Sequence, residues 1–282
     1  MIGTLFSLYT LQRFPYVSAI NAPCLKGMML MTLVTFSSIA LICFSGGLLS
    51  GLAGFGALVI IVPAMALLVG MGVAVPLGVL CGIACQSINA YLYRAHVQKN
   101  TLFKMLAGAL PGIWIGVSLL AHLPEVLLRF LLGLLLIGYV LWRILQRKLP
   151  APTGEPAAPW AYVAGFFSGG FGSAFGINGP PVVVYLTRTN WTPEAIRAFI
   201  GVFCGLLFVI TALALLLRGL FPQEVWRLAL LAIPCCLAGN LCGRLITARM
   251  DTHQYMRLVF LLLFAMGLSL CWPAVRFYIL GL

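Results

Sequence analysis

The longest charge-free stretch of this sequence covers residues 27–93, which contain no Asp, Glu, Lys or Arg. A membrane-crossing helix needs about 20 apolar residues, so this stretch has room for three helical segments. Of the 282 residues, 62% are hydrophobic and 8% are charged. A single soluble core stops growing beyond about 250–300 residues and could not bury so much apolar surface. The sequence therefore predicts an all-α integral membrane protein.

Glycine and proline clusters divide the apolar sequence into about 8–10 membrane segments. In a first repeat, residues 27–148, we expect two helix arms and three spans, at 29–47, 57–71, 76–93, 102–121 and 126–145. A Pro/Ala-rich connector at 149–159 leads to a second repeat, residues 160–282. There we expect two short arms and three spans, at 160–171, 177–187, 195–217, 225–246 and 254–275. Residues 1–26 are expected to form an N-terminal extension.

The two halves of the chain carry the same glycine pattern. Five residues of the first half recur 118 positions later: Gly47, Ser50, Gly51, Gly54 and Pro63 as Gly165, Ser168, Gly169, Gly172 and Pro181. Further along, the offset is about 123: Gly78, Cys81, Gly82, Pro111 and Gly116 recur as Gly201, Cys204, Gly205, Pro234 and Gly239. A hairpin plus three spans makes an odd number of crossings, so the second half is expected to be inverted relative to the first. Transporters are commonly built from such inverted repeats.

The excess of positive charge indicates how the chain is oriented in a membrane. There are 17 Lys and Arg against 5 Asp and Glu, mostly at the ends of apolar runs, where they meet lipid headgroups rather than nucleic acid. If the 94–104 loop is cytoplasmic, so are 143–148, 188–197 and 244–257, and eleven of the 17 basic residues lie on that side. We therefore expect a multi-pass protein of a bacterial cytoplasmic (inner) membrane, oriented by the positive-inside rule.

The distribution of acids, histidines and cysteines argues against an enzyme. The 5 Asp and Glu and 3 His all lie at span ends or in loops, and the 9 cysteines form no C-x-x-C pair. Intramembrane proteolysis needs paired aspartates, a Ser–His pair or a zinc motif. We expect no enzymatic activity, metal or cofactor, and we expect the cysteines to pack as small hydrophobes.

Two glycine-rich segments, 46–56 and 168–181, are expected to form the non-helical tips of two helical hairpins. An interrupted helix presents unpaired N–H groups and the positive end of its dipole at the start of the second arm. Two tips approaching from opposite faces would form a midplane pocket for a small oxyanion. The candidate substrate-binding residues are Ser50, Gly54, Gly56, Gln86, Asn89, Ser168, Gly172, Gly176, Asn178, Gly179 and Pro180.

Some glycines and prolines have structural explanations. We expect close helix packing, as in small-xxx-small patterns, at Gly47, Gly51, Gly112 and Gly116. Pro180 and Pro181 cannot donate backbone hydrogen bonds, and they fit the first turn of a new half-helix.

Three polar residues within the spans have open roles. Gln86 and Asn89 are three positions apart and share a helix face, so they either line the pocket or hydrogen-bond neighbouring helices. Arg244 lies near the end of a late span, and we expect its side chain to extend to the cytoplasmic interface.

The paired tips at 51–63 and 169–185, the duplication, and the repeated Pro111…Gly116 and Pro234…Gly239 motifs resemble the TauE/SafE family of sulfite-exporter-like permeases over residues 29–275. This resemblance implies a duplicated inner-membrane protein associated with export or uptake of sulfite, sulfonates and related organic anions. The main hypothesis is a transporter of such anions. The alternatives are an anion channel on the same scaffold and a non-transporting membrane subunit. The coupling ion and the oligomeric state stay open.

Overall fold

The computed structural model describes residues 22–54, 56–93, 97–146, 157–247, 261 and 263–272. The chain divides into two compact units, residues 1–39 and 40–282. The described part of the first unit, from residue 22, is the beginning of helix α2. All that follows concerns the second unit. Residues 1–21 of the expected N-terminal extension and 149–156 of the expected connector lie outside the described residues.

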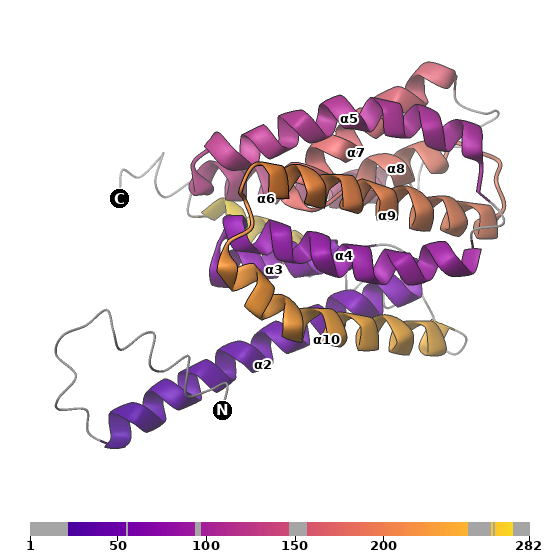
Figure 1. The fold of residues 1–282 in the computed structure, drawn as a ribbon. Helices are drawn as coiled ribbons and strands as arrows, with labels where there is room; N and C mark the ends of the chain where they lie inside the picture. Colours follow the sequence, from indigo (N-terminus) through magenta and orange to yellow (C-terminus); the bar gives the residue numbers. More distant parts are fainter. Residues whose placement is uncertain are drawn as a thin grey trace. The chain divides into compact units, whose positions relative to one another are not determined.

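The described residues form helices and turns, with no strand among them (Figure 1). In chain order the helices are α2 (Ala22–Ala53), α3 (Ala57–Val69), α4 (Met71–Tyr93), α5 (Lys99–His122), α6 (Glu125–Gln146), α7 (Ala158–Phe175), α8 (Gly179–Leu186), α9 (Pro193–Leu217) and α10 (Gln223–Thr247). Leu263–Trp272 is a further apolar helix, within the expected last span. Within the described part of the chain, six helices are long and apolar enough to cross a membrane: α2, α4, α5, α6, α9 and α10. The expected all-helical membrane architecture is confirmed to this extent.

Glycines with positive φ interrupt the described helices at four places, and two of these lie within the glycine-rich segments expected from the sequence. Gly54 and Gly56, with φ of 79° and 99°, separate α2 from α3. Gly176, with φ of 70°, ends α7, and the following N–H of Ile177 donates back to the Phe171 carbonyl at 3.3 Å. Glycine is favoured at such helix ends because a Cβ would strain the left-handed conformation. These two interruptions are called the first break (54–56) and the second break (176–178) below.

The breaks are shorter than the glycine-rich tips that the sequence predicted. Ser50 lies inside α2, and Ser168 and Gly172 lie inside α7, so none of the three belongs to a non-helical tip. With 18 residues, α7 is about 27 Å long, and the 8-residue α8 is about 12 Å long. The expected short arm at 160–171 is therefore wrong in length. Pro180 and Pro181 do occupy the first turn of a new helix, α8, as expected.

The helical glycines are explained by two close helix contacts. A Cβ on Gly112 would overlap the Phe166 carbonyl of α7, and one on Gly169 would overlap the Ala109 carbonyl of α5. Figure 1 shows α5 lying along α7. A second contact joins α2 to α10, where a Cβ on Gly47 or Gly51 would overlap the backbone of α10. The same holds for Gly116 against α7, so the expectation that Gly47, Gly51, Gly112 and Gly116 permit close packing is confirmed.

Helices α4 and α9 pack against each other in opposite directions. Along α4, Gly82 faces Phe208 of α9. Further along, Gln86 faces Gly205 and Asn89 faces Gly201. Residue numbers therefore rise along α4 as they fall along α9. The repeated glycines of these spans allow this approach. A Cβ on Gly201 would lie 3.1 Å from the Asn89 Cβ, and one on Gly205 would lie 3.6 Å from the Gln86 Cβ. The two glycines of α9 thus leave room for the two amide side chains of α4.

The two halves can be aligned by their helix positions or by their glycine motifs. Near the breaks, these two alignments differ. Helices α3 and α8 begin 122 residues apart, at Ala57 and Gly179, and α4 and α9 also begin 122 residues apart. The sequence offset of 118 pairs Gly54 with Gly172, but the break corresponding to Gly54 falls at Gly176. The difference is four residues, about one helical turn. At the helix offset of 122 only Gly47 and Gly54 of the five motif residues meet an identical residue, Gly169 and Gly176, so the sequence match favours a register that the helices do not adopt.

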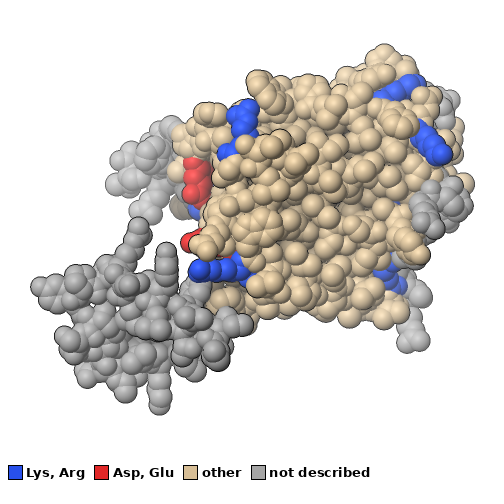
Figure 2. Space-filling view, in the orientation of Figure 1, with Lys and Arg blue, Asp and Glu red and all other residues tan. Residues whose placement is uncertain are grey.

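The surface of the second unit separates charge from apolar side chains. On the face shown in Figure 2, Lys and Arg gather at two opposite ends, with a broad band free of charged residues between them. Large apolar side chains are exposed on the spans, among them Phe103, Leu110 and Trp114 of α5. A band of exposed apolar side chains between two charged ends is the pattern of a protein surrounded by lipid.

Candidate functional site

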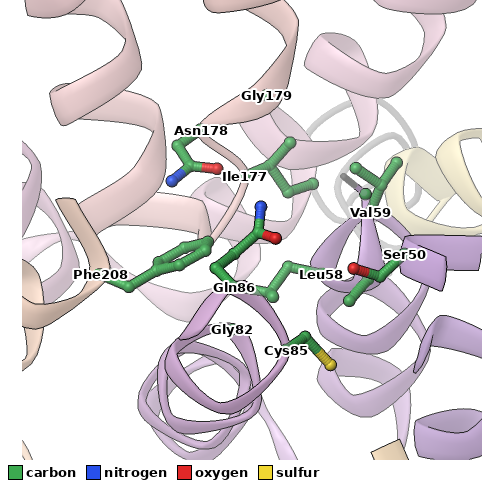
Figure 3. Close-up of a pocket in the computed structure, with 13 residues that line it drawn as sticks. Ser50, Leu58, Val59, Gly82, Cys85, Gln86, Ile177, Asn178, Gly179 and Phe208 are labelled. Atoms are coloured by element: carbon green, nitrogen blue, oxygen red, sulfur yellow. The ribbon is translucent and has the colours of Figure 1, made fainter. Parts of the chain in front are cut away.

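The two breaks border one cavity in the second unit (Figure 3). It is lined by Ser50, Gly56, Ala57, Leu58, Val59, Gly82, Cys85, Gln86, Gly176, Ile177, Asn178, Gly179 and Phe208. Gly82 lies at the middle of α4, and Phe208 is an interior residue of α9. The space is about 10 Å³, close to the smallest volume that holds one water molecule.

Two polar side chains at this cavity are buried without a hydrogen-bond partner. Ser50 is 1% exposed and its Oγ is unpaired, and Asn178 is 5% exposed with an unpaired Nδ2. Ser50 comes from the helix before the first break, and Asn178 lies in the second break. A buried polar group without a partner costs about 1–3 kcal/mol. Both groups can donate hydrogen bonds, so each can interact favourably with an acceptor that enters the cavity.

The Asn178 segment is held from behind by α7. The Ser168 hydroxyl donates to the Asn178 carbonyl oxygen at 2.7 Å, and a Cβ on Gly172 would lie 3.0 Å from the Asn178 Cβ. Asn178 occupies the N-cap position of α8, yet its side chain makes no capping hydrogen bond. A capping bond would use the side-chain oxygen, so the unpaired amide nitrogen is available to a ligand in either case.

The two breaks do not offer equal numbers of backbone donors. At the start of α3, the N–H groups of Ala57 and Leu58 have no acceptor within their own helix, because the first N–H groups of any helix lack one. At the start of α8, Pro180 and Pro181 carry no N–H, which leaves Gly179 as the first donor of that helix. The second break therefore contributes mainly the Asn178 side chain instead of a row of amides.

A chain of polar side chains connects the cavity to α10. The Nδ2 of Asn89 donates to Gln86 Oε1 at 2.5 Å and to the Gly54 carbonyl at 3.1 Å. Arg244 in turn donates from Nη2 to Asn89 Oδ1. The guanidinium of Arg244 is thus hydrogen-bonded to Asn89, which itself bonds the cavity residue Gln86. Arg244 does not line the cavity, and its extension to the membrane interface stays a prediction.

Six of the sequence-predicted site residues line the cavity: Ser50, Gly56, Gln86, Gly176, Asn178 and Gly179. Four others do not line it but contact the residues that do: Gly54, Asn89, Ser168 and Gly172. Pro180 does not line the cavity. Sequence reasoning missed Ala57, Leu58, Val59, Gly82, Cys85, Ile177 and Phe208. Of these, Gly82 belongs to the repeated glycine pattern, which could have indicated it. Nothing in the sequence pattern distinguishes Phe208 from the other apolar residues of its span.

Free cysteines form a buried group beside the cavity, and one of them, Cys85, lines it. The thiols of Cys85 on α4 and Cys236 on α10 are 3.2 Å apart, and both side chains are buried, as are those of Cys43 and Cys81. Among the residues that the structure describes, no group of three or more His, Cys, Asp or Glu side chains is arranged to hold a metal ion.

Comparison with known proteins identifies the family. The model of the sulfite exporter TauE/SafE family matches residues 39–270, which include every residue that lines the cavity. The chain belongs to the sulfite exporter TauE/SafE family. It is also similar to a protein of Cupriavidus necator called probable sulfite/organosulfonate exporter TauE, with 28% identity over 197 residues, 66% of this chain and 73% of that protein. No solved structure matches the chain. Family membership and the six long apolar helices make this TauE/SafE protein a multi-pass membrane transporter.

Proposed function

We propose that this TauE/SafE protein exports small anions such as sulfite or organosulfonates across the bacterial inner membrane and binds them between the two breaks. The observation that carries the proposal is the pair of unpaired donors, Ser50 Oγ and Asn178 Nδ2, which reach the same cavity from different halves of the chain. A sulfonate or sulfite group presents acceptor oxygens only. It can therefore satisfy both donors at once, whereas in the unliganded protein both remain costly.

The charge around the cavity agrees with an anionic substrate. None of the residues lining it is Asp or Glu, so no carboxylate repels a negative ligand. The absence of acids from the lining also gives a cation no counter-charge. A cytoplasm negative by about 100 mV drives each negative charge outward with about 2.3 kcal/mol. Export of a monoanion then proceeds without a coupled ion.

The size of the cavity requires the breaks to separate during transport. A space of about 10 Å³ admits one water molecule at most, and a sulfonate group is larger. The proposed mechanism is alternating access, in which two hairpins that enter from opposite membrane faces move apart around a midplane site. The inverted repeat behind this mechanism is supported by α4 and α9, which correspond between the halves and run in opposite directions.

Anion counterflow in proteoliposomes tests the proposal. Purified protein is reconstituted, and uptake of radiolabelled sulfite or sulfoacetate is driven by the same unlabelled anion inside the vesicles. Replacing Asn178 with Leu removes the unpaired amide at similar volume, and we expect counterflow to fall about tenfold or more, the loss typical of one hydrogen bond to a charged ligand. The matched control is Thr211→Val, because Thr211 also has a buried, unpaired hydroxyl but does not line the cavity.

The outcomes separate the alternatives. Equal counterflow in wild type and the Asn178→Leu variant contradicts binding at the second break. Unitary currents in planar bilayers would identify an anion channel in place of a carrier. A correctly folded wild type that neither moves nor binds any of these anions would indicate a non-transporting subunit, because a ligand that binds only the folded state must raise its thermal stability.

A further inference from the structure

In the hydrogen bonds that connect Arg244 to the cavity, each residue donates to the next one toward the cavity. An arginine side chain has donors and no acceptor, so the amide atom that faces Arg244 must be the oxygen of Asn89. The two ends of an amide have nearly the same shape, and their orientation is decided by their hydrogen-bond partners. Arg244 therefore fixes the orientation of Asn89.

The orientation of the Asn89 amide in turn determines the orientation of the Gln86 amide. With its oxygen on Arg244, Asn89 has only its Nδ2 left, and the two hydrogens of that nitrogen go to Gln86 Oε1 and the Gly54 carbonyl. Gln86 must then present its own oxygen to Asn89 and its nitrogen elsewhere. Figure 3 shows the Gln86 nitrogen directed toward Ile177 in the second break. The cavity receives N–H donors from Gln86 in addition to those of Asn178.

The chain is buried along most of its length, which strengthens the effect. Asn89 is 2% exposed and Gln86 is 4% exposed, and Gly201 and Gly205 of α9 leave the space that these amides fill. Hydrogen bonds in such low-dielectric surroundings polarise one another, and a positive charge at one end enhances donation at the other. A reversed chain would turn the Gln86 oxygen toward the cavity and repel an anion.

We infer that Arg244 and Asn89 are positioning residues that set the charge selectivity of the site, by holding Gln86 as a donor toward a sulfonate or sulfite group without touching that group themselves. This inference rests on the proposed function and adds to it the reason why the site takes anions. It names three residues on two helices, α4 and α10, that act as one unit. The property it predicts is discrimination between a sulfonate and a neutral sulfonamide of the same size.

Two probes of nearly equal size measure that discrimination: 2-hydroxyethanesulfonate, a monoanion, and 2-hydroxyethanesulfonamide, in which an NH2 group replaces one sulfonate oxygen, so that the molecule is neutral. Their dissociation constants are determined by isothermal titration calorimetry on the purified full-length protein. The wild type should prefer the monoanion. In the Asn89→Asp variant the carboxylate offers oxygens to both Arg244 and Gln86. Gln86 then turns its oxygen to the cavity, and affinity for the monoanion should fall roughly 10- to 100-fold, with a smaller change for the sulfonamide, whose N–H can donate to that oxygen.

Arginine variants separate positioning from structural support. Arg244→Gln permits either amide orientation and should also reduce the preference for the monoanion, whereas Arg244→Lys keeps a donor and a charge and should restore it. Lys104→Gln is the matched control, because it removes one positive charge from α5, a helix that does not line the cavity. If Asn89→Asp does not fold, the Arg244→Gln and Arg244→Lys pair decides the question.

The two possible failures are distinguishable. A wild-type protein that binds neither probe nor sulfite contradicts the proposed function and, with it, this inference. A wild type that binds the monoanion, together with folded Asn89→Asp and Arg244→Gln variants that keep the wild-type preference, overturns the role of Arg244 and Asn89 alone.

Discussion

Two serines occupy matching places in the repeated motif but differ in what their hydroxyl groups do. Ser50 has an unpaired hydroxyl at the cavity, whereas the hydroxyl of Ser168 donates to the Asn178 carbonyl and supports the second break. The structural register differs from the motif register by one turn, so the two serines have different neighbours. Identical residues at matching motif positions are therefore not equivalent, and their substitutions should have opposite effects on stability.

Replacing Ser50 with Ala should raise the free energy of unfolding or leave it unchanged, because the change removes a buried hydroxyl that has no partner. The same change should weaken anion binding about tenfold, since one donor to the ligand is lost. Replacing Ser168 with Ala should instead lower the free energy of unfolding by about 1–3 kcal/mol, because it removes the donor to the Asn178 carbonyl. Thermal unfolding with and without sulfite measures both effects. Equal destabilisation by the two substitutions would contradict the different roles.

At the scale of helices, the glycines of α7 differ sharply in how closely α5 approaches them. Gly169 faces the Ala109 carbonyl so closely that a Cβ would overlap it, whereas a Cβ on the adjacent Gly170 would lie 3.6 Å from the nearest atom, the Gly112 carbonyl oxygen. Close backbone contact of this kind stabilises helix pairs in membranes, where no hydrophobic effect drives helices together. The two neighbouring positions provide an internal comparison.

Gly169→Ala should push α5 and α7 apart and cost about 1–3 kcal/mol, the typical price of overpacking. Gly170→Ala should be neutral or slightly stabilising, because alanine favours a helix over glycine by about 0.5–1 kcal/mol and the site has room for a methyl group. Thermal unfolding of the two variants in the same detergent makes the comparison. Similar melting temperatures for both would show that the contact between α5 and α7 is looser than described.

The contact between α4 and α10 can be tested through its cysteines. The thiols of Cys85 and Cys236 are 3.2 Å apart, so a variant retaining only these two cysteines should form an intramolecular disulfide when treated with a membrane-permeant oxidant such as diamide. Mass spectrometry of the digested protein detects the linked peptides. A variant retaining Cys85 and Cys271 is the control, because the Cys271 thiol lies against the Phe130 carbonyl of α6 instead. Equal linking in both variants would argue against the α4–α10 contact.

At the scale of the whole transporter, helix directions determine the topology that alternating access requires. Helix α5 runs parallel to α7, α2 runs parallel to α10, and α4 runs antiparallel to α9, as the order of their facing residues indicates. Together with the basic residues near the 94–104 loop, these directions predict that the α4–α5 and α8–α9 connections face the cytoplasm. The α5–α6 and α9–α10 connections then face the opposite side.

Cysteine labelling in oriented cells tests this topology. Four exposed positions are suitable for single cysteine substitutions: Gln98, Asn190, His122 and Gln223. We expect a membrane-impermeant maleimide added outside to label cysteines at His122 and Gln223 and to leave those at Gln98 and Asn190 unlabelled until the membrane is opened. Labelling of all four from one side would contradict inverted halves. A reversed pattern would keep the inverted repeat but overturn the orientation inferred from charge.

The sequence by itself determined the membrane class, the positions of most helices and the two break regions, because apolar run length, glycine and proline act locally. It also indicated Ser50, Gln86 and Asn178, since polar residues are conspicuous in apolar helices. Only the tertiary structure decided which glycines bend the chain and which pack against another helix, because that depends on the facing backbone. It alone brought Arg244 to Asn89, since a hydrogen bond across 155 positions depends on how α4 and α10 pack and leaves no mark in local sequence.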